Sequence, residues 1–321
     1  MFILERLNVA LDVEEDDEDA DDDEADGLNN EYDEENTELK QIGSLLVDKS
    51  GYDLGSGAAE WVRPCSFLDH SNQRVQAVCK CIRADEDAQI EISCLFKYCK
   101  YFGFPIVYRC ETVGHFNYIV MKDYTNGCLL DLVDTVSNYL SRPSTHFVRH
   151  FVYGLVESLL TMSENGDVHG DVKCDNILVD DGPDHRSVLI DFGHSSQTGS
   201  KVYNATVLYS PPEMFRQEVN GDRVAIPVTS SDKIDVWAVG CVAYMLGSLG
   251  DVDLEEGILD GEDCNFIKPL NLEKLEAPVA DFVSFCMKPN PETRPTISQV
   301  FNHPFLTYYR SNRQEISEYV N

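Results

Sequence analysis

The chain has 321 residues, which is enough for one large domain with two lobes or for two ordinary domains. Hydrophobic residues make up 43% of it, so a sizeable core is available. The formal net charge of −32 at pH 7 disfavours binding to nucleic acid and to anionic membranes. Basic peptides or proteins are instead the partners that this charge would attract.

The most apolar segment, residues 236–249, is too short to span a bilayer and predicts a buried helix. Residues 1–6 lack the basic and apolar regions of a secretory signal. Eleven cysteines are scattered without the spacing of a zinc site or of a disulfide framework. We therefore expect reduced thiols and an intracellular location, cytoplasmic or nuclear.

Residues 1–45 are dominated by acidic side chains. Between Asp12 and Glu35 the sequence has sixteen acids and no base. Such a block repels itself and cannot bury enough apolar surface to fold, which predicts a disordered leader. The alternative hypothesis is a docking or autoinhibitory segment that competes for a basic partner.

The next segment, residues 46–123, is rich in predicted strands. Residues 75–82 alternate between apolar and polar side chains, and residues 116–122 form a second predicted strand. Between them, residues 87–101 carry apolar side chains at the spacing of a helix face. These patterns predict a small β-rich lobe.

From residue 124 to residue 307 the pattern becomes helical. Helices are predicted over residues 129–140, 146–163 and 235–249. The chain is thus expected to have an α+β fold, with a small β-rich lobe followed by a larger helical lobe. Residues 308–321 would form a short tail.

Two polar motifs fall within the helical lobe. The first is H-G-D-V-K-C-D-N at residues 169–176, and the second is D-F-G, which begins at Asp191. A carboxylate at Asp171 can accept the proton of an attacking hydroxyl, and a cation at Lys173 can neutralise a phosphoryl group in transfer. Asn176 and Asp191 offer the hard oxygen ligands that Mg²⁺ prefers.

In this order, the two motifs resemble the catalytic loop and metal-binding turn of the eukaryotic protein kinase family. Six ordered motifs carry the resemblance over roughly residues 50–306. Lys173 is typical of the serine/threonine branch. The resemblance implies a two-lobed fold that binds ATP and Mg²⁺ and phosphorylates Ser/Thr hydroxyls of protein substrates. It also implies that Asp171 is the catalytic base and that Asn176 and Asp191 are the metal ligands.

The glycine-rich loop of the family has a partial match at residues 55–62. Gly55, Gly57 and Val62 agree with the pattern G-x-G-x-x-G-x-V, but Glu60 stands where the family has its third glycine. Glycines let backbone N–H groups approach phosphate oxygens closely. An acid at this point is expected to weaken nucleotide affinity.

Lys80 lies in an apolar strand, where an unpaired charge is costly. By resemblance it contacts the α- and β-phosphates and pairs with a glutamate on a helix. Glu91 is the expected partner, with Glu86 and Asp87 as competing choices.

Residues 118–124 resemble the strand and hinge that bind adenine in the family. Met121 would lie at the back of the pocket, and backbone groups near Asp123 and Tyr124 would bind the base. Backbone recognition leaves little side-chain signature, so this match rests on order along the chain.

Three later features resemble supporting parts of the family. Residues 205–213 resemble the end of the family's activation segment, and Thr206 within them matches a threonine that contacts the catalytic aspartate and lysine in serine/threonine kinases. Glu213 and Arg294 would form a buried ion pair that acts as a clamp. Asp235, at the start of the predicted buried helix, is expected to accept backbone N–H bonds from the catalytic loop.

The catalytic loop departs from the family pattern at Gly170, where many members carry an arginine. That arginine often binds a phosphate on the activation segment, so its absence suggests an enzyme that does not need such a phosphate. His169 is expected to orient the loop, because Asp171 is better placed to act as a base.

Two alternative functions remain open. The similarity of residues 169–171 to aminoglycoside and choline kinases suggests a small-molecule phosphotransferase, although Lys173 and the D-F-G motif are typical of protein kinases. Glu60 and the acidic leader suggest a non-catalytic scaffold. For a protein kinase, Asp175 and the acidic composition favour substrates with basic residues near the phosphoacceptor. No pattern indicates an oligomeric state.

Overall fold

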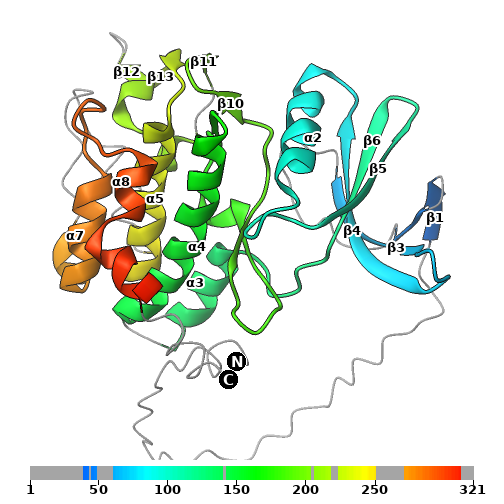
Figure 1. Ribbon diagram of the computed structural model, residues 1–321, viewed down its shortest axis with the longest axis horizontal. Helices are drawn as coiled ribbons and strands as arrows, with labels where there is room; N and C mark the ends of the chain where they lie inside the picture. Colours follow the sequence, from blue (N-terminus) through cyan, green and yellow to red (C-terminus); the bar gives the residue numbers. More distant parts are fainter. Residues whose placement is uncertain are drawn as a thin grey trace, which may run out of the picture. The chain divides into compact units, whose positions relative to one another are not determined.

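The computed structural model (Figure 1) describes residues 39–42, 45–48, 61–139, 142–203, 206–217, 223–250 and 271–311. These residues fall into two compact units. A β-rich unit holds the described residues up to Arg83 together with Arg109–Asp123. A helical unit holds residues 84–108 and the described residues from Tyr124 onwards. The predicted combination of a small β-rich part and a larger helical part is therefore confirmed.

The β-rich unit is built on a six-stranded sheet with the strand order β1-β2-β3-β4-β6-β5. The pairs β1–β2, β2–β3, β3–β4 and β4–β6 are antiparallel. At the turn between β3 and β4, the Asp69 carboxylate accepts N–H bonds from Ser71 and Gln73 at 2.8 and 2.9 Å. The strands are β1 (Leu39–Ile42), β2 (Leu45–Asp48), β3 (Trp61–Leu68), β4 (Arg74–Arg83), β5 (Val107–Val113) and β6 (Phe116–Met121).

One face of this sheet forms a hydrophobic core. Strands β4 and β6 confirm the strands predicted over residues 75–82 and 116–122. The sheet already begins at Leu39, within the range 1–45 that the sequence assigned to a leader. The rest of that range, residues 1–38 and 43–44, lies outside the described residues. The buried core members are Ile42, Leu45, Val47, Cys65, Ala77, Cys79, Cys81, Tyr118 and Val120.

Helix α2 (Glu86–Tyr98) confirms the predicted helix but ends three residues early. Asp85 caps its start by accepting the Ala88 N–H at 2.9 Å. Glu91, Leu95 and Tyr98 are spaced by one and two helical turns and are all buried. By its contacts α2 belongs to the helical unit, whereas the sequence placed it in the first lobe.

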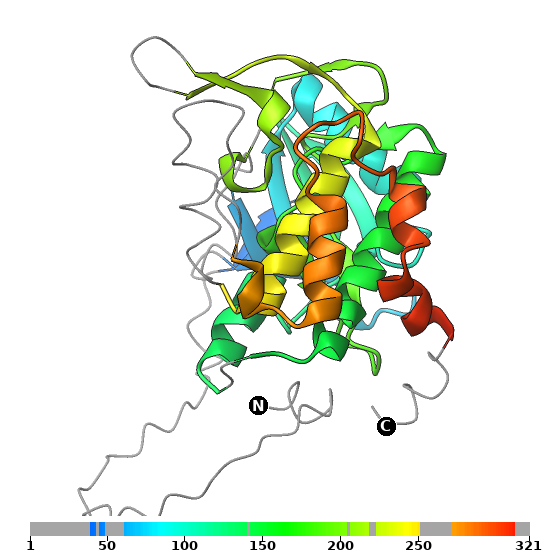
Figure 2. The ribbon, with the colours of Figure 1, turned by 90° about the vertical axis from the view of Figure 1, so that its left-hand side faces the viewer.

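The helical unit is organised around α5 (Asp232–Ser248), whose residues 234–247 are all buried. Helices α4 and α7 lie beside it in both ribbon views (Figures 1 and 2). Because α5 is covered on every side, its sequence is apolar around the whole helix rather than along one stripe. The other helices are α3 (Leu129–Ser137), α4 (Thr145–Glu164), α7 (Ala277–Cys286) and α8 (Ile297–Phe301), and residues 304–311 are also helical.

These helices confirm the three that were predicted in this part of the chain. Helix α5 begins at Asp232, three residues before the predicted start, and α3 ends at Ser137 rather than at residue 140. Within the described ranges, none of the helices combines the length and the apolar character needed to cross a bilayer.

Short strands hold the loops that connect these helices. They form four antiparallel pairs within the helical unit. The pairs are β7 (Asp167–Val168) with β10 (Ser196–Gln197), β8 (Ile177–Val179) with β9 (Ser187–Leu189), β11 (Lys201–Val202) with β14 (Val228–Thr229), and β12 (Phe215–Gln217) with β13 (Arg223–Ala225).

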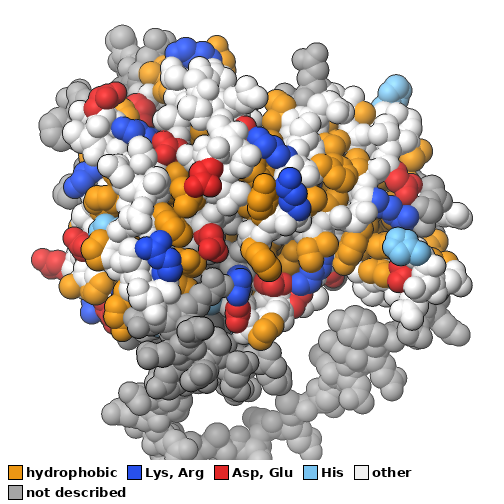
Figure 3. Space-filling model, in the orientation of Figure 1, with side chains coloured by type: hydrophobic (Ala, Val, Ile, Leu, Met, Phe, Trp, Pro, Cys, Tyr) orange, Lys and Arg blue, Asp and Glu red, His pale blue; other side chains and the backbone are white. Residues whose placement is uncertain are grey.

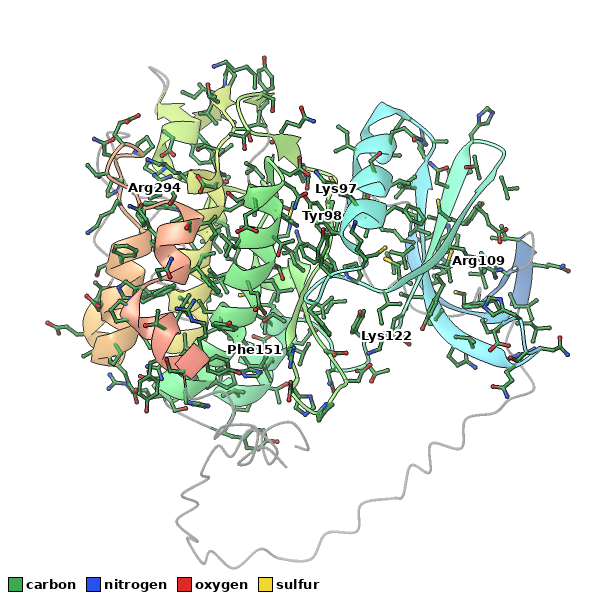
Figure 4. The ribbon with its side chains drawn as sticks, viewed as in Figure 1. Lys97, Tyr98, Arg109, Lys122, Phe151 and Arg294 are labelled. Carbon is green, nitrogen blue, oxygen red and sulfur yellow. The ribbon has the colours of Figure 1, made fainter. Side chains whose placement is uncertain are left out.

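The predicted ion pair between Glu213 and Arg294 is present. Both terminal nitrogens of Arg294 donate to the Glu213 carboxylate, at 2.7 and 2.8 Å. The Arg294 side chain (Figure 4) is 0% exposed and also donates to the carbonyl oxygens of Lys233 and Lys288. Its guanidinium lies 5.1 Å from the centre of the Trp237 ring. The buried charge is thus fully compensated, and the pair joins two segments that are far apart in the sequence.

A second buried polar group is His150 on α4. Its Nε2 lies 3.2 Å from the carbonyl oxygen of His185, so Nε2 carries the proton. Its Nδ1 then accepts the Tyr309 hydroxyl, at 2.8 Å. Burial lowers the pKa of His150 to about 4, so the ring is neutral at physiological pH.

We expect Glu213→Ala to lower the free energy of unfolding by about 3–5 kcal/mol, because it leaves the Arg294 charge buried without its carboxylate. Chemical denaturation of the whole chain would measure the loss. Asp184→Ala is a matched control, since it breaks the partly exposed pair with Arg186 and should cost less than about 1 kcal/mol. Equal losses in the two variants would contradict the clamp.

His150 should also make the free energy of unfolding depend on pH. Its pKa is about 4 when folded and 6.5 when unfolded, so below pH 6.5 the unfolded chain takes up the proton first. Between pH 7 and pH 5 this group should remove about 2 kcal/mol of stability. His150→Gln keeps polar contacts but does not titrate. Urea unfolding at both pH values should therefore give a smaller pH effect in the variant; an equal effect would refute the assignment.

Candidate active site

The catalytic loop predicted at residues 169–176 lies between β7 and β8. Its backbone is held by the buried Asp235, which lies in the first turn of α5. The N–H groups of His169 and Gly170 donate to the two carboxylate oxygens at 2.8 and 2.9 Å. Burial raises the pKa of Asp235 to about 7, although these two N–H donors work in the opposite direction. The role predicted for Asp235 is therefore observed.

His169 is completely buried and makes contacts that fix the loop. Its Nε2 lies 3.0 Å from the Ile190 carbonyl oxygen, which places the ring proton on Nε2. Its Nδ1 accepts the backbone N–H of Asp171 at 3.3 Å. Burial lowers the pKa of His169, so the ring stays neutral. These contacts agree with an orienting role rather than with a role as base.

Three side chains donate hydrogen bonds to the Asp171 carboxylate. Lys173 Nζ donates at 2.8 Å, Asn176 Nδ2 donates at 3.0 Å, and the Thr206 hydroxyl donates to the other oxygen. Burial acts to raise the pKa of Asp171, but the bonds from Lys173 and Thr206 hold it below its usual value. The carboxylate is therefore ionised at neutral pH. The structure brings together four residues that the sequence predicted for one site.

Asn176 and Asp191 are the predicted metal ligands. Both side-chain hydrogen bonds of Asn176 use its amide nitrogen, so in the described part of the chain its amide oxygen remains available to a cation. Asp191 adopts φ +64°, a conformation that non-glycine residues rarely take. Among the described residues, no three metal-binding side chains cluster together. A site with two protein ligands suits Mg²⁺, which usually keeps phosphate oxygens and waters as its other ligands.

Glu91 is buried on α2 and lies near the D-F-G turn. A Cβ atom built on Gly193 would be 3.7 Å from Asp191 Oδ1 and 4.0 Å from Glu91 Oε2, so both carboxylates face this glycine. The competing residues Glu86 and Asp87 lie in the first turn of α2, but their side chains are outside the description.

The β-rich unit carries most of the predicted nucleotide-binding residues. Lys80 lies on β4, opposite Val62 of β3 and Ile119 of β6. Met121 ends β6, opposite Val78 of β4. Gly55, Gly57 and Glu60 lie outside the described residues.

The predicted hinge residues lie at the change from one unit to the other. Asp123 is the last residue of the β-rich unit, and Tyr124 is the first residue of the next segment of the helical unit. The Tyr124 hydroxyl accepts the Ile106 N–H at 3.2 Å. Their expected contacts with adenine stay a prediction.

Aromatic contacts that the sequence did not predict surround Phe192 of the D-F-G turn. Its ring lies 6.4 Å from Tyr98, 6.0 Å from Phe104 and 5.3 Å from His169, measured between ring centres. Tyr98 was visible in the sequence only as one apolar position on a helix face. Asp167, which accepts the Tyr98 hydroxyl at 2.6 Å, lies outside the motifs that the sequence analysis identified.

Gly170 has a local structural reason to be glycine. Its φ is +81°, and a Cβ atom there would lie 2.7 Å from the carbonyl oxygen of His194. It lines a groove of about 810 Å³ between α2 and residues 193–203. The groove thus passes the position where the family usually has an arginine.

The family profile described as "Protein kinase domain" matches residues 50–306. Because the match covers most of the sequence, the chain belongs to the protein kinase family. Its fold and the order of its motifs agree with that membership.

The chain is also similar to individual kinases. It is 29% identical over 203 residues to "Calcium/calmodulin-dependent protein kinase type 1" of Caenorhabditis briggsae, which covers 60% of this chain and 52% of the relative. It is 26% identical over 239 residues to "Serine/threonine-protein kinase cds1" of Schizosaccharomyces pombe, and this match covers 70% of this chain and 48% of the relative. It is 28% identical over 197 residues to "Myosin-IIIa" of Mus musculus, and this match covers 59% of this chain and 12% of the relative. The chain therefore spans at most about half the length of these relatives.

We expect Gly170→Ala to lower both stability and phosphoryl transfer. The substitution adds backbone strain of about 1–2 kcal/mol and pushes the loop away from the carbonyl oxygen of His194. Gly166→Ala is a matched control, because Gly166 has φ +77° but open space around the position of a Cβ atom. Thermal unfolding should show a larger loss for Gly170→Ala, and only that variant should lose activity per folded molecule. Equal effects would show that the contact with His194 does not matter.

Proposed function

We propose that this chain acts as a serine/threonine protein kinase that uses ATP and Mg²⁺. The proposal is carried by the Asp171 carboxylate, which stays ionised and receives bonds from Lys173, Asn176 and Thr206. An oxygen held in this way can accept the proton of a hydroxyl nucleophile. Family membership and the similarity to a kinase named for serine and threonine support the proposal.

On the acceptor side, Asp171 takes the proton of the attacking Ser or Thr hydroxyl. Lys173 donates to Asp171 and offsets negative charge on the phosphoryl group in transfer. Thr206 reaches Asp171 from the activation segment and keeps the carboxylate in one orientation. When bound, ATP and Mg²⁺ supply the γ-phosphoryl group and the positive charge that screens its oxygens.

On the nucleotide side, Lys80 and Glu91 position the α- and β-phosphates as a pair. Asn176 and Asp191 would hold Mg²⁺ through their side-chain oxygens. The burial of Glu91 supports its part in the pair, because a buried carboxylate needs a charged or hydrogen-bonding partner.

The remaining nucleotide contacts come from the glycine-rich loop and the hinge. Val62 faces Lys80 across two paired strands, which supports its assignment beside the phosphate-binding lysine. By their order along the chain, Gly55 and Gly57 are assigned to phosphate binding, and Met121, Asp123 and Tyr124 are assigned to adenine binding.

The protein substrate is proposed to carry basic residues near its phosphoacceptor. Asp175 is exposed and only four residues from Asp171, so a basic side chain of a bound peptide could pair with it. On the face of the helical unit in Figure 3, acidic and basic side chains are interspersed. We assign the preference to Asp175 because it is exposed and close to Asp171 in the sequence.

Two further features belong to the proposal. The kinase domain comprises residues 46–307, and with Gly170 in its loop it works without a phosphate on the activation segment. No disulfide joins any of the ten cysteines in the described ranges, which supports a reducing intracellular compartment, cytoplasmic or nuclear.

The proposal predicts that Asp171→Asn lowers kcat by about 10²–10⁴-fold, because the substitution removes the general base. The assay is ³²P transfer from γ-labelled ATP with Mg²⁺ to basic proteins, followed by phosphoamino-acid analysis. Asp134→Asn, on the exposed side of α3, is the control for an unrelated loss of charge and should retain activity. The label should appear on serine or threonine.

Two results would contradict this function. A folded wild type that binds ATP without any transfer would indicate a scaffold. Transfer to aminoglycosides or choline but not to proteins would indicate a small-molecule phosphotransferase.

A further inference from the structure

Asp167 is a buried carboxylate that lies two residues before His169. It belongs to β7, which pairs with β10 and leads directly into the catalytic loop. Its side chain is 10% exposed, and one of its oxygens, Oδ2, receives hydrogen bonds from both Lys97 and Tyr98. Both donors, which Figure 4 labels, come from the last turn of α2. A single oxygen therefore joins that helix to the strand before the loop.

Tyr98 makes the more important of these two bonds. Its side chain is 0% exposed, and its hydroxyl donates to Asp167 at 2.6 Å. Burial, with a further contribution from Asp167, raises the pKa of Tyr98, so the hydroxyl keeps its proton and remains a donor. Lys97 is 41% exposed, so solvent screens its charge and its bond contributes less.

The ring of Tyr98 contacts the D-F-G turn at the same time. It stacks on Phe104 at 5.0 Å and on Phe192 at 6.4 Å, and Phe192 in turn contacts His169. One residue at the end of α2 is therefore bound through its hydroxyl to the strand before the catalytic loop and through its ring to the metal-binding turn.

The same helix face carries Glu91. Glu91 and Tyr98 are seven residues apart, which is two helical turns and roughly 10 Å along the axis. A contact that fixes Tyr98 therefore also limits how far α2 can rotate or slide at Glu91. Glu91 Oε2 faces the D-F-G turn at Gly193, so a small movement of α2 would change the distance between these parts.

We infer that Tyr98 and Asp167 are positioning residues: their hydrogen bond holds α2 so that Glu91 lies in place for catalysis. The inference rests on the proposed kinase function, since it assigns Glu91 a part in binding the phosphates. Neither residue touches the substrate. Their effect reaches the reaction through the orientation of α2.

Tyr98→Phe tests this inference, because it removes only the hydroxyl and keeps the stacked ring. We expect kcat to fall about tenfold, the size expected when one buried hydrogen bond that fixes geometry is lost. Amides of α2 should exchange hydrogen faster, as measured by mass spectrometry on the full chain. Tyr309→Phe is the matched control: it also removes a buried hydroxyl with a hydrogen bond, but its partner is His150. It should leave kcat and α2 exchange unchanged.

Two variants of Asp167 separate positioning from simple stability. Asp167→Asn keeps an oxygen that can accept the Tyr98 hydroxyl, so it should retain most of the activity. Asp167→Leu keeps no acceptor and should lower kcat at least as much as Tyr98→Phe. Activities are compared per folded molecule, at a temperature well below the unfolding transition of every variant.

Three outcomes would overturn the inference. The first is equal kcat and equal α2 exchange in Tyr98→Phe and Tyr309→Phe. The second is an equal loss of kcat in Asp167→Asn and Asp167→Leu, which would assign the effect to the charge. The third is unchanged hydrogen exchange of α2 in Tyr98→Phe when the wild type transfers no phosphate, which is the case in which the proposed function fails. Hydrogen exchange then decides alone, and unchanged exchange of α2 in Tyr98→Phe refutes the contact as a restraint on the helix.

Discussion

The position of the catalytic loop depends on one buried carboxylate, that of Asp235. Helix α5 is covered over nearly its whole length, so its first turn cannot shift without disturbing the close-packed core. Asp235 lies in that turn and receives the backbone N–H groups of His169 and Gly170. The loop backbone is thereby fixed to the core itself. The side chains that surround Asp171 then need only short bonds within or next to the loop.

Two other buried polar contacts join segments that are distant in the sequence. Glu213 and Arg294 connect the end of the activation segment to the loop before α8, and Tyr98 and Asp167 connect α2 to β7. Buried polar groups add little net stability, but each becomes costly when its partner moves away. Such contacts therefore select one arrangement of the segments, whereas the apolar core alone would accept several.

The sequence predicted the long elements because their periodicity is local. Helices α4 and α5 and strands β4 and β6 each show a repeat that can be read without knowing what covers them. Their ends were less accurate. The apolar spacing of α2 continues to Tyr101, but the Tyr101 N–H bonds to the Tyr98 carbonyl oxygen three residues earlier, as in a turn. Periodicity records which side a residue faces and not which carbonyl its N–H reaches.

The sequence predicted those contacts of the candidate site in which both residues belong to a recognised motif. Asp171 with Lys173 lies within one short loop, and Glu213 with Arg294 was found because each belongs to a motif of known order. The grouping of α2 with the helical unit was not predicted, because the side chains responsible come from separate stretches of the chain.

Tyr98 and Asp167 escaped prediction for the same reason: 69 residues separate them, and neither belongs to a motif. A weaker signal was present, since a tyrosine on an apolar helix face needs a buried acceptor for its hydroxyl. The two kinds of contact that Tyr98 makes also restrain different motions. A stack of rings resists separation but tolerates sliding, because its energy changes little with small lateral shifts. A hydrogen bond weakens steeply as its angle and length depart from the optimum. The bond to Asp167 therefore restrains the sliding motion that the ring stack allows.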